Sequence, residues 1–388
     1  MQLSTRTQHL SSSLVREILA VAQQPDMISF AGGLPAAACM PELDLSRIPA
    51  RFNQYGESQG EPAFRATIAA HLQTLGLPVS AEQILVTAGS QQGIDLISKL
   101  CIDPGTAVMV ERPTYLAATQ CFRFFGARLI ELQPGESGPD LAALRTQLAR
   151  ERPAFVYLIP TFQNPTGQCY SLATRQAIAS LLDEFEVGLV EDDPYRELVY
   201  EDCERTPICS FLQRAKWVYL GSFSKVAIPG LRLGYLAAHP ALYDALLKIK
   251  QASDLHSNRW GQYLLNEFVQ SPAYPAHLNA LRQHYRQQRE IMADCLNQDF
   301  AALAQWERPV GGLFFWVRLT QQHDMMALLQ KALANKVAFM PGQPFFADTS
   351  QVYPAMRLNF SHSNAAQIKL GLQRLHALLT ESSRPARD

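Results

Sequence analysis

The chain has 388 residues, of which 47% are hydrophobic and 18% are charged, an ordinary composition for a globular protein. Its 34 Lys and Arg residues balance 35 Asp and Glu residues to a net charge of −1, which gives no reason to expect binding to nucleic acid or to a membrane surface. No apolar run reaches the roughly 20 residues that span a bilayer, and the N-terminus lacks a signal-peptide pattern, so we expect a cytoplasmic protein of two or three domains.

The cysteines and histidines give little support to disulfides or metal chemistry. Seven cysteines are scattered without a Cys-x-x-Cys pair, and nine histidines form neither a His-x-x-x-His nor a His-Glu-x-x-His pattern. An odd number of cysteines without a pairing pattern fits a reducing cytoplasm. We therefore expect no metal centre.

The first part of the chain contains a helix pattern and two motifs with glycine. Residues 11–21 begin with serines followed by spaced apolar residues, which predicts a capped helix that could cover a site. Residues 28–35 read Ile-Ser-Phe-Ala-Gly-Gly-Leu-Pro, and residues 54–60 read Gln-Tyr-Gly-Glu-Ser-Gln-Gly. The adjacent Gly32 and Gly33 predict a flexible approach to a substrate.

A strand and a helix are predicted around a segment rich in small residues. Residues 83–87 predict a strand that runs into Ala-Gly-Ser-Gln-Gln-Gly at 88–93 and then into a helical pattern. Glycine and serine at a helix N-terminus present free backbone N–H groups, which suits a phosphate dianion. The segment lacks the Gly-Lys-Ser/Thr of a Walker loop and the Gly-x-Gly-x-x-Gly of a dinucleotide site, which disfavours nucleotide binding. After the next strand, at 107–111, Tyr115 is placed to stack on a flat ring.

The next apolar strand ends in a turn that contains an asparagine. Residues 155–160 predict the strand, and Asn-Pro-Thr-Gly follows at 164–167. These are ordinary turn formers, so a loop with no chemical duty is the plain alternative. Ligands of α/β proteins bind at the ends of parallel strands, however, and the Asn164 amide is a good hydrogen-bond donor for such a ligand.

A strand at 187–191 ends in acidic residues and a tyrosine. Asp192 and Asp193 come next, followed by Pro194 and Tyr195. The plain alternative is that the two aspartates cap the element that begins at the proline. Without further signals we would prefer this capping role. Because a lysine follows some 30 residues later, we prefer a chemical role for these residues.

That lysine stands in a segment suited to forming an imine. Residues 218–235 break from a hydrophobic run into Ser222, Ser224 and Lys225, and Arg232 follows. A lysine at the mouth of a buried strand and close to a guanidinium is held in its neutral, nucleophilic form, although such a lysine is more often the solvated start of a helix. The serines and the arginine would supply donors for a phosphate.

A reactive lysine beside a phosphate site indicates pyridoxal phosphate. Its pyridine nitrogen needs a carboxylate, which Asp192 or Asp193 could supply. Its phenolic oxygen needs hydrogen bonds, which Tyr195 and Asn164 could supply. The amide could also bind a substrate carboxylate.

The order of patterns predicts two domains. Residues 46–275 alternate apolar strands with helical patterns, which predicts a large α/β domain around a mostly parallel sheet. Residues 281–292 predict a connecting helix whose basic residues we interpret as a solvated face. Short strands at 310–319, 337–340 and 356–360, separated by helices, predict a smaller α+β domain within 276–388.

These motifs together resemble the fold-type I, pyridoxal-phosphate-dependent aminotransferases of class I/II, over nearly the whole chain. The likeness is greatest to the group with 2-aminoadipate, kynurenine and aromatic aminotransferases, and it is carried by residues 28–35, 54–60, 87–92 and 191–195. The resemblance implies a seven-stranded, mostly parallel sheet in the large domain, and it assigns residues 1–45 to the smaller domain.

The resemblance also implies a role for each motif residue. Lys225 forms the imine and moves the proton, Asp192 rather than Asp193 pairs with the pyridine nitrogen, and Tyr195 and Asn164 bind the phenolic oxygen. Arg357 is similar to the arginine that binds the substrate α-carboxylate, with Asn164 and Gly33 beside it. The remaining cofactor-binding residues are Ser90, Gln91, Ser222, Ser224 and Arg232 at the phosphate, Tyr115 against the ring, and Tyr55, which reaches the phosphate of a neighbouring subunit. Tyr55 thereby implies a homodimer.

One segment departs from the pattern of the family. Residues 36–40 read Ala-Ala-Ala-Cys-Met, where relatives carry an acidic or polar residue and then Phe-Pro. This leaves open the shape of the wall on the substrate side, but not the cofactor chemistry.

The function implied is transfer of an amino group from an L-amino acid to 2-oxoglutarate by a ping-pong mechanism. The donor is 2-aminoadipate, an aromatic amino acid or a branched or aliphatic one, and the motifs do not choose among them. A β-lyase remains an alternative because it uses the same electron sink. An amino-acid-sensing regulator is disfavoured, because too few residues precede Ile28 for a DNA-binding domain.

Overall fold

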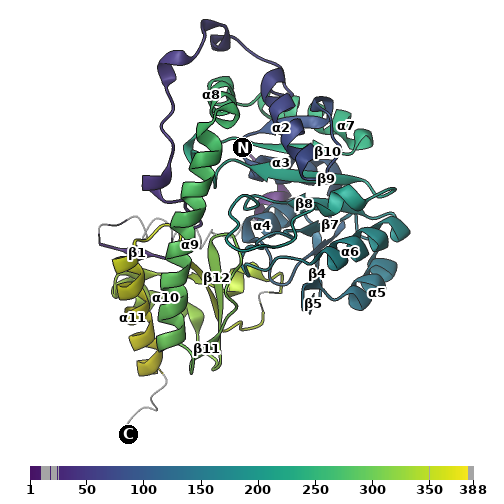
Figure 1. Ribbon diagram of the computed structural model, residues 1–388. Coiled ribbons are helices and arrows are strands. Elements are labelled where there is room, and N and C mark those ends of the chain that lie inside the picture. Colours follow the sequence, from purple (N-terminus) through teal and green to yellow (C-terminus); the bar gives the residue numbers. More distant parts are fainter. Residues whose placement is uncertain (10–17, 19–23, 25, 349, 383–388) are drawn as a thin grey trace.

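The structure is a computed structural model that describes residues 1–9, 18, 24, 26–348 and 350–382. Most of the helix predicted at residues 11–21 lies outside the described residues; Ile18, which is described, is buried. A seven-stranded sheet and a four-stranded sheet, both flanked by helices, dominate the part of the chain that the structure describes, and two two-stranded sheets accompany them (Figure 1).

The larger sheet has seven strands in the order β2-β10-β9-β8-β7-β3-β4. β10 runs antiparallel to both of its neighbours, and the other neighbouring pairs are parallel. This confirms the predicted mostly parallel sheet of a fold-type I enzyme. The strands are β2 (Ile84–Thr87), β3 (Ala107–Val110), β4 (Arg128–Glu131), β7 (Phe155–Leu158), β8 (Gly188–Asp192), β9 (Trp217–Ser222) and β10 (Gly234–Ala238).

Helices cover both faces of this sheet, which is why its central strands read as continuous apolar runs. Successive strand residues face opposite sides, so Ile84 and Val86 pack with one set of helices and Leu85 packs with the other. On the first face lie α2 (Pro62–Thr74), α5 (Leu141–Glu151), α6 (Leu172–Phe185) and α8 (Arg259–Gln270). On the second face lie α3 (Ser90–Cys101), α4 (Leu116–Phe124) and α7 (Pro240–Asp254).

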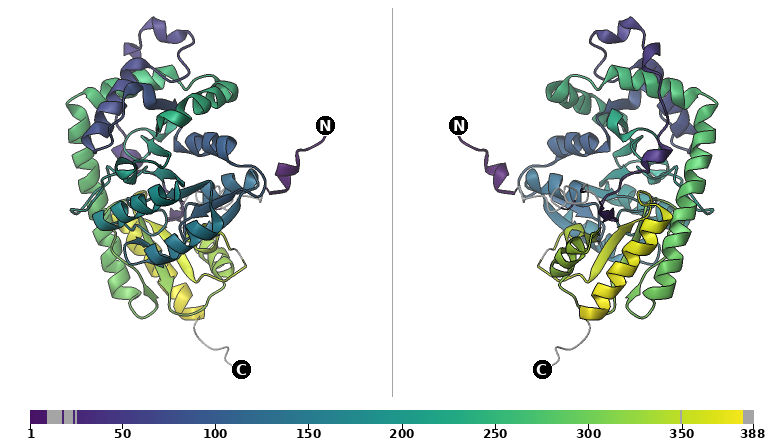
Figure 2. Two further views of the ribbon diagram at one scale, coloured as in Figure 1. Left: turned by 90° about the vertical axis from the view of Figure 1, so that its right-hand side faces the viewer. Right: turned by 90° about the vertical axis from the view of Figure 1, so that its left-hand side faces the viewer.

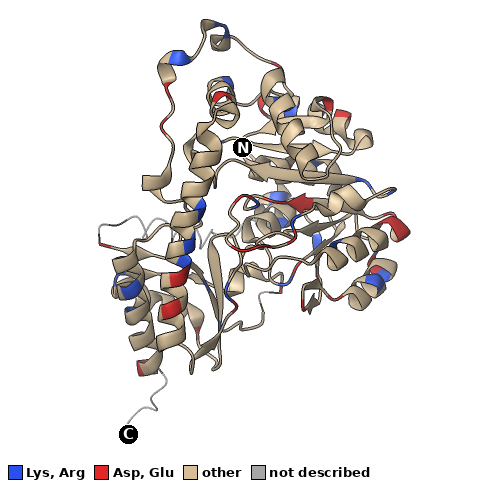
Figure 3. Cartoon of the chain, in the orientation of Figure 1, with Lys and Arg blue, Asp and Glu red and all other residues tan. Residues whose placement is uncertain are grey.

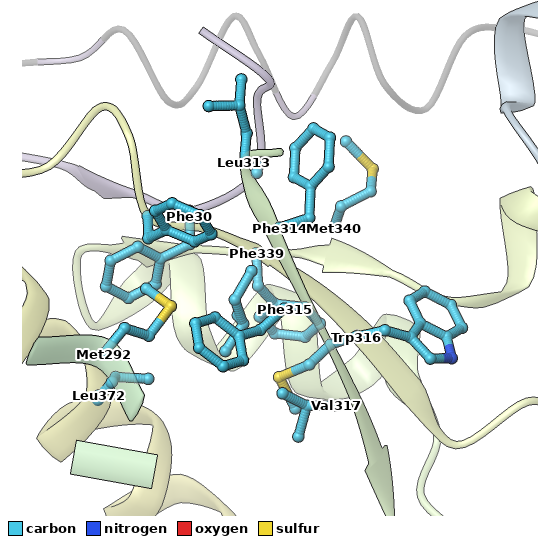
Figure 4. Close-up of a cluster of buried hydrophobic side chains, with 14 of the residues drawn as sticks. Phe30, Met292, Leu313, Phe314, Phe315, Trp316, Val317, Phe339, Met340 and Leu372 are labelled. Atoms are coloured by element: carbon cyan, nitrogen blue, oxygen red, sulfur yellow. The ribbon is translucent and has the colours of Figure 1, made fainter. Parts of the chain in front are cut away.

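The smaller sheet is antiparallel and has the order β11-β12-β15-β14. Its strands are β11 (Ala304–Gln305), β12 (Phe314–Leu319), β14 (Met340–Pro341) and β15 (Ala355–Asn359). Near it lie α9 (Ala273–Asp299), α10 (Met325–Ala334) and α11 (Ala365–Ser382). Phe315 and Val317 extend from β12 into the apolar cluster with Met292 of α9 and Leu372 of α11, whereas Phe314 and Met340 lie beside each other on the opposite side of the strand (Figure 4).

The N-terminal segment packs with the smaller sheet and its helices. β1 (Ile28–Ser29) pairs in parallel with β13 (Val337–Ala338), and Phe30 donates its backbone N–H to Ala338 O at 2.8 Å. A two-stranded hairpin of β5 (Pro134–Gly135) and β6 (Gly138–Pro139) stands apart. Short 3-10 helices occur at Thr5–His9, Ala37–Cys39, Leu45–Arg47, Ala50–Asn53, Ala81–Gln83, Ile208–Phe211, Pro229–Leu231 and Gln343–Phe345.

The predicted connecting helix is longer than the pattern indicated. α9 runs for 27 residues from the neighbourhood of α8 to the smaller sheet, where it packs beside α11 (Figures 1 and 2). Its basic residues form only part of the solvated face that we expected: Arg286 is exposed, but Arg282 is partly buried and Arg289 is buried. Arg289 is fully buried and pairs with Glu201 and Glu290, and Arg282 pairs with Glu197 at 2.8 Å. Along α9 the basic residues lie in the middle of the helix, and the acidic residues follow toward its C-terminal end (Figure 3).

None of the helices among the described residues combines the length and the apolar character that a membrane span requires.

Candidate active site

A cavity of about 330 Å³ lies at the C-terminal ends of the parallel strands of the larger sheet. It is also lined by residues 31–35 of the N-terminal segment and by residues from the smaller sheet. The predicted residues on its wall are Gly33, Ser90, Gln91, Tyr115, Asn164, Asp192, Tyr195, Ser222, Ser224, Lys225, Arg232 and Arg357. The structure thus brings together all of the predicted site residues except Tyr55.

The topology of the sheet explains this convergence. β7, β8 and β9 are adjacent and parallel, so Asn164, Asp192 and Ser222, at or after their ends, meet at one edge. β10 is antiparallel, so its first residues lie at that same edge, and Arg232 precedes it by two positions.

Lys225 lies at the centre of this arrangement, in the turn after β9. Its Nζ donates to the carbonyl oxygen of Gly33 at 2.9 Å. Burial lowers the pKa of Lys225 from 10.5 to about 8, and the nearby guanidinium groups of Arg357 and Arg232 act in the same direction. The amine is therefore neutral, and so nucleophilic, at a lower pH than an ordinary lysine, with the neutral form predominant above about pH 8.

The two neighbouring aspartates have different surroundings. Asp192 lines the cavity, its Oδ2 accepts a hydrogen bond from Tyr157 OH at 2.6 Å, and its buried Oδ1 has no partner. Asp193 does not line this cavity, and its Oδ2 binds Arg196 Nε at 2.7 Å and Tyr219 OH at 2.9 Å. Only Asp192 offers the cavity an unsatisfied carboxylate oxygen.

The protonation of Asp192 depends on what faces it. Burial raises the pKa of Asp192 to about 7; the hydrogen bond from Tyr157 opposes this rise, and the charge of Asp193 adds to it. A buried polar atom without a partner costs free energy of about 1–3 kcal/mol, more when it is charged. A protonated pyridine nitrogen would satisfy Oδ1 and favour the ionised carboxylate, so this residue fits pyridoxal phosphate.

Arg357, Asn164 and Tyr195 form a hydrogen-bonded group in the wall of the cavity. Arg357 Nη1 donates to Asn164 Oδ1 at 2.8 Å, and Asn164 Nδ2 donates to Tyr195 OH at 3.2 Å. The guanidinium also donates to Ala31 O at 2.6 Å, and its carbon lies 4.1 Å from the ring centre of Phe314. The amide and the hydroxyl are thus already oriented relative to the arginine.

Arg357 is a buried cation in need of an anion. It stands in β15, an interior strand, and is 5% exposed. Its hydrogen-bond partners are neutral oxygens, its Nε is buried without a partner, and burial lowers its pKa to about 10. A carboxylate on a substrate would supply the missing charge and a paired hydrogen-bond geometry.

The phosphate-binding segment is built around Gly89. This residue has φ of +84°, which is strained for a residue with a side chain, and a Cβ there would lie 2.7 Å from Arg232 Nη2 and would displace that guanidinium. Arg232 also donates to Ala88 O at 3.3 Å and to Ser224 Oγ at 3.4 Å. Ser90 begins α3, whose first N–H groups have no partner within the helix. This set of donors fits a phosphate group.

Tyr115 and Tyr55 have contrasting positions. Tyr115 is half-buried, lines the cavity and donates its hydroxyl to Gln91 Oε1 at 3.4 Å. Tyr55 is 76% exposed, lies outside the cavity and has its ring edge against His256. Arg259 Nη1 fixes its backbone, with a bond of 2.6 Å to Gln54 O and one of 3.2 Å to Tyr55 O.

Residues 36–40, which depart from the pattern of the family, do not line the cavity. Its wall in this region is formed by residues 31–35. Ala36 is buried, and its N–H donates to Tyr285 OH of α9 at 2.9 Å. The residues of this departure therefore lie outside the wall of the cavity.

The sequence reasoning missed Tyr157, Phe314 and Met340. Tyr157 holds Asp192, and the other two line the cavity. A tyrosine within the otherwise apolar β7 was a signal for the first, because a buried hydroxyl needs a partner. The described residues contain no group of three or more His, Cys, Asp or Glu side chains that could hold a metal ion.

Known proteins match this chain along most of its length. Aminotransferase class I and II is the family that matches, over residues 33–375. A 2-aminoadipate transaminase of Thermus thermophilus is 37% identical over 377 residues, with 94% of this chain and 93% of that protein covered. An aromatic-amino-acid aminotransferase of Thermococcus litoralis is 33% identical, with 96% and 92% covered.

A solved structure shows the same fold with a cofactor derivative. It is an alpha-aminoadipate aminotransferase of Thermus thermophilus, complexed with N-(5'-phosphopyridoxyl)-L-leucine, and it has a TM-score of 0.89 and 34% identity, with 98% of this chain and 97% of that chain covered. The family, the fold and the fit of Asp192, Lys225 and the Gly89 segment agree. The chain therefore belongs to the class I and II aminotransferases, with pyridoxal phosphate as its cofactor.

Proposed function

We propose that the protein transfers the amino group of an L-amino acid to 2-oxoglutarate in a ping-pong reaction. We rank 2-aminoadipate and aromatic amino acids first as donors, followed by branched and aliphatic ones. The relatives named 2-aminoadipate and aromatic aminotransferases support this ranking. The observation that carries the proposal is a lysine with a lowered pKa in the same cavity as an unpaired carboxylate oxygen of Asp192 and the unpaired Nε of Arg357.

When bound, pyridoxal phosphate supplies an electrophilic carbon and a ring that accepts the electrons released at the substrate Cα. The role that we assign to Lys225 is to bind the cofactor covalently and then to remove the Cα proton with its Nζ. Asp192 Oδ1 would accept the proton of the pyridine nitrogen. Asn164 and Tyr195 would donate hydrogen bonds to the phenolic oxygen. Arg357 holds the substrate α-carboxylate, with Gly33 beside it, so that the Cα–H bond stays within reach of the amine.

The remaining cavity residues would bind the rest of the cofactor. Tyr115 lies where it could cover one face of the ring. The phosphate ligands that we propose are Ser90, Gln91, Ser222, Ser224 and Arg232. Tyr55 would bind the phosphate of a second subunit, and its exposure outside its own cavity supports a homodimer in which each site is completed by the partner.

We also propose that residues 46–275 form the large domain, and that residues 1–45 and 276–388 form the small one. The pairing of β1 with β13 supports the assignment of the N-terminal segment. A cytoplasmic location is supported by the seven cysteines, all of which are free thiols.

An absorbance titration tests the function. The purified protein is titrated with a panel of L-amino acids and then with 2-oxoglutarate. We expect the visible band of the bound cofactor to give way to a near-ultraviolet band, and the keto acid to restore it. Relative rates across the panel rank the donors. A bound chromophore that no amino acid converts would contradict transamination, and release of pyruvate and ammonia without an acceptor would favour a β-lyase.

A further inference from the structure

Lys250 is a buried lysine outside the cavity. It stands near the C-terminal end of α7 and is 0% exposed. An ammonium group is seldom buried unless all of its donors are paired. Its three N–H donors have three side-chain partners: Gln92 Oε1 at 2.9 Å, Asp254 Oδ2 at 2.8 Å and Ser257 Oγ at 2.9 Å. These three contacts offset the cost of burying the charge, so Lys250 and its partners form one connected network.

The partners of Lys250 hold the segment that leads into the phosphate site. Gln92 Oε1 accepts a second hydrogen bond from the backbone N–H of Ala88 at 2.8 Å, and Ser257 Oγ donates to Val86 O at 3.1 Å. Both ends of residues 86–88 are therefore tied to the same ammonium group. The following residue is Gly89, the N-cap of α3.

The side-chain amide of Gln92 has only one orientation in this network. Its oxygen receives N–H groups from Lys250 and Ala88, and its nitrogen donates to Asp254 Oδ2 at 2.8 Å. A reversed amide would place donors against donors. The lysine thereby keeps the glutamine oxygen directed at the backbone of Ala88, whose carbonyl accepts from Arg232 on the cavity side at 3.3 Å.

We infer that Lys250 is a positioning residue for the cofactor phosphate, which acts through Gln92 and the backbone of Ala88 to fix the N–H groups at the start of α3. This inference rests on the proposed phosphate site at Ser90, Gln91 and Arg232. The lysine does not line the cavity, so its contribution is to the shape of the site and not to a direct contact. Binding of a phosphate dianion depends on such fixed donors.

The test is to measure binding of pyridoxal phosphate and of pyridoxal, which has no phosphate, to full-length protein freed of its cofactor. Lys250→Met should weaken binding of pyridoxal phosphate about tenfold, the loss expected for one hydrogen-bonded support, and should leave pyridoxal unchanged. Lys248→Met is the matched control, because Lys248 is on the same helix, pairs with Asp244 and has a side chain that is 71% exposed. The control should bind both compounds as the unmodified protein does.

Two outcomes overturn the inference. Equal weakening for both compounds would make Lys250 a support of the fold alone, and unchanged binding of both would remove its role. If Lys250→Met does not fold, Gln92→Met breaks the link to Ala88 while leaving Lys250 its aspartate, and the same selective loss is expected. Failure of the proposed phosphate site would differ from all of these, because the unmodified protein would then not prefer pyridoxal phosphate to pyridoxal. Failure of transamination would leave that preference intact and would appear only in the absorbance titration.

Discussion

The edge of the larger sheet and the interior of the smaller sheet supply different parts of one cavity. The larger sheet contributes residues at strand ends and in turns, such as Asp192 and Lys225. The smaller sheet contributes Arg357 from the middle of a strand, with Phe314 against its guanidinium. The first group surrounds the proposed cofactor position, and the second offers a buried positive charge to a substrate. In the proposed function, cofactor chemistry and binding of the substrate carboxylate are thus divided between two structural units.

Removing the amine of Lys225, on the side of the larger sheet, should have the largest effect on turnover. Lys225→Ala should reduce turnover by about 10⁴-fold or more, because both covalent binding and proton transfer are lost. The visible cofactor band should disappear as well, while thermal unfolding stays cooperative. Steady-state kinetics and absorbance check this. Turnover near that of the unmodified protein would refute the role of the lysine.

Removing the buried cation of the smaller sheet should act on binding. Arg357→Ala should raise KM for every α-amino acid by about 100-fold, because the lost charge-assisted pair contacts the carboxylate that all of them share. The absorbance of the bound cofactor should remain. Kinetics with an aromatic, an acidic and an aliphatic amino acid check this. A rise in KM for only one of these classes would assign Arg357 to side-chain selection.

The consecutive residues Asp192 and Asp193 allow a comparison of a catalytic and a structural role within the larger sheet. Asp192→Asn should lower kcat about 100-fold with little loss of stability, because the charge opposite the ring nitrogen is removed. Asp193→Asn should instead lower the free energy of unfolding by about 3 kcal/mol, since it breaks a buried ion pair with Arg196 whose side chains are 0% and 5% exposed. Kinetics and urea denaturation of both variants distinguish them. The reverse pattern would exchange the two roles.

A smaller effect concerns pH. Because only the neutral amine attacks, protein freed of its cofactor should combine with pyridoxal phosphate faster as pH rises through about 8, the pKa of Lys225. Arg357→Met should move this midpoint to higher pH, since the arginine lowers that pKa. Stopped-flow absorbance measures the rate at each pH. An unchanged midpoint in the variant would mean that the charge of Arg357 does not influence the pKa of Lys225.

The lowered pKa of Lys225 also determines how the free energy of unfolding depends on pH. The pKa of Lys225 is lower in the folded protein than the ordinary value of 10.5, so between about 8 and 10.5 the unfolded chain binds more protons. The contribution of this lysine to the free energy of unfolding therefore rises with pH across that interval. Comparison of the unmodified protein with Lys225→Met isolates this contribution.

Much of the larger sheet could be predicted from sequence, because its strands are continuous apolar runs that end in polar residues. Asp192, Asn164 and Ser222 were recognisable for that reason, and parallel strands bring such ends together. Arg357 was found through the resemblance to the family. The predictions at the strand ends depended on local patterns and on one topological rule.

The contacts that complete the site could not be predicted in this way. Lys225 bonds to Gly33 across 192 residues, and Arg357 bonds to Ala31 across 326. Tyr157 and Lys250 act through partners that no local pattern reveals. Arg289 was misassigned because its partner Glu201 lies on a distant segment, so a run of basic residues resembled a solvated face. Long-range pairing determines whether a charged residue is buried.

The antiparallel course of β10 has a mechanical consequence. Ser222 at the end of β9 pairs with Gly234 at the start of β10, so residues 223–233 form a closed loop whose two ends are joined by the sheet. A parallel neighbour would have required a long crossover in place of this short connection. Lys225 and Arg232, the arginine of the proposed phosphate site, both belong to that loop. A displacement of the smaller sheet can therefore change the distance between Lys225 and Arg357 without changing the distance between Lys225 and Arg232.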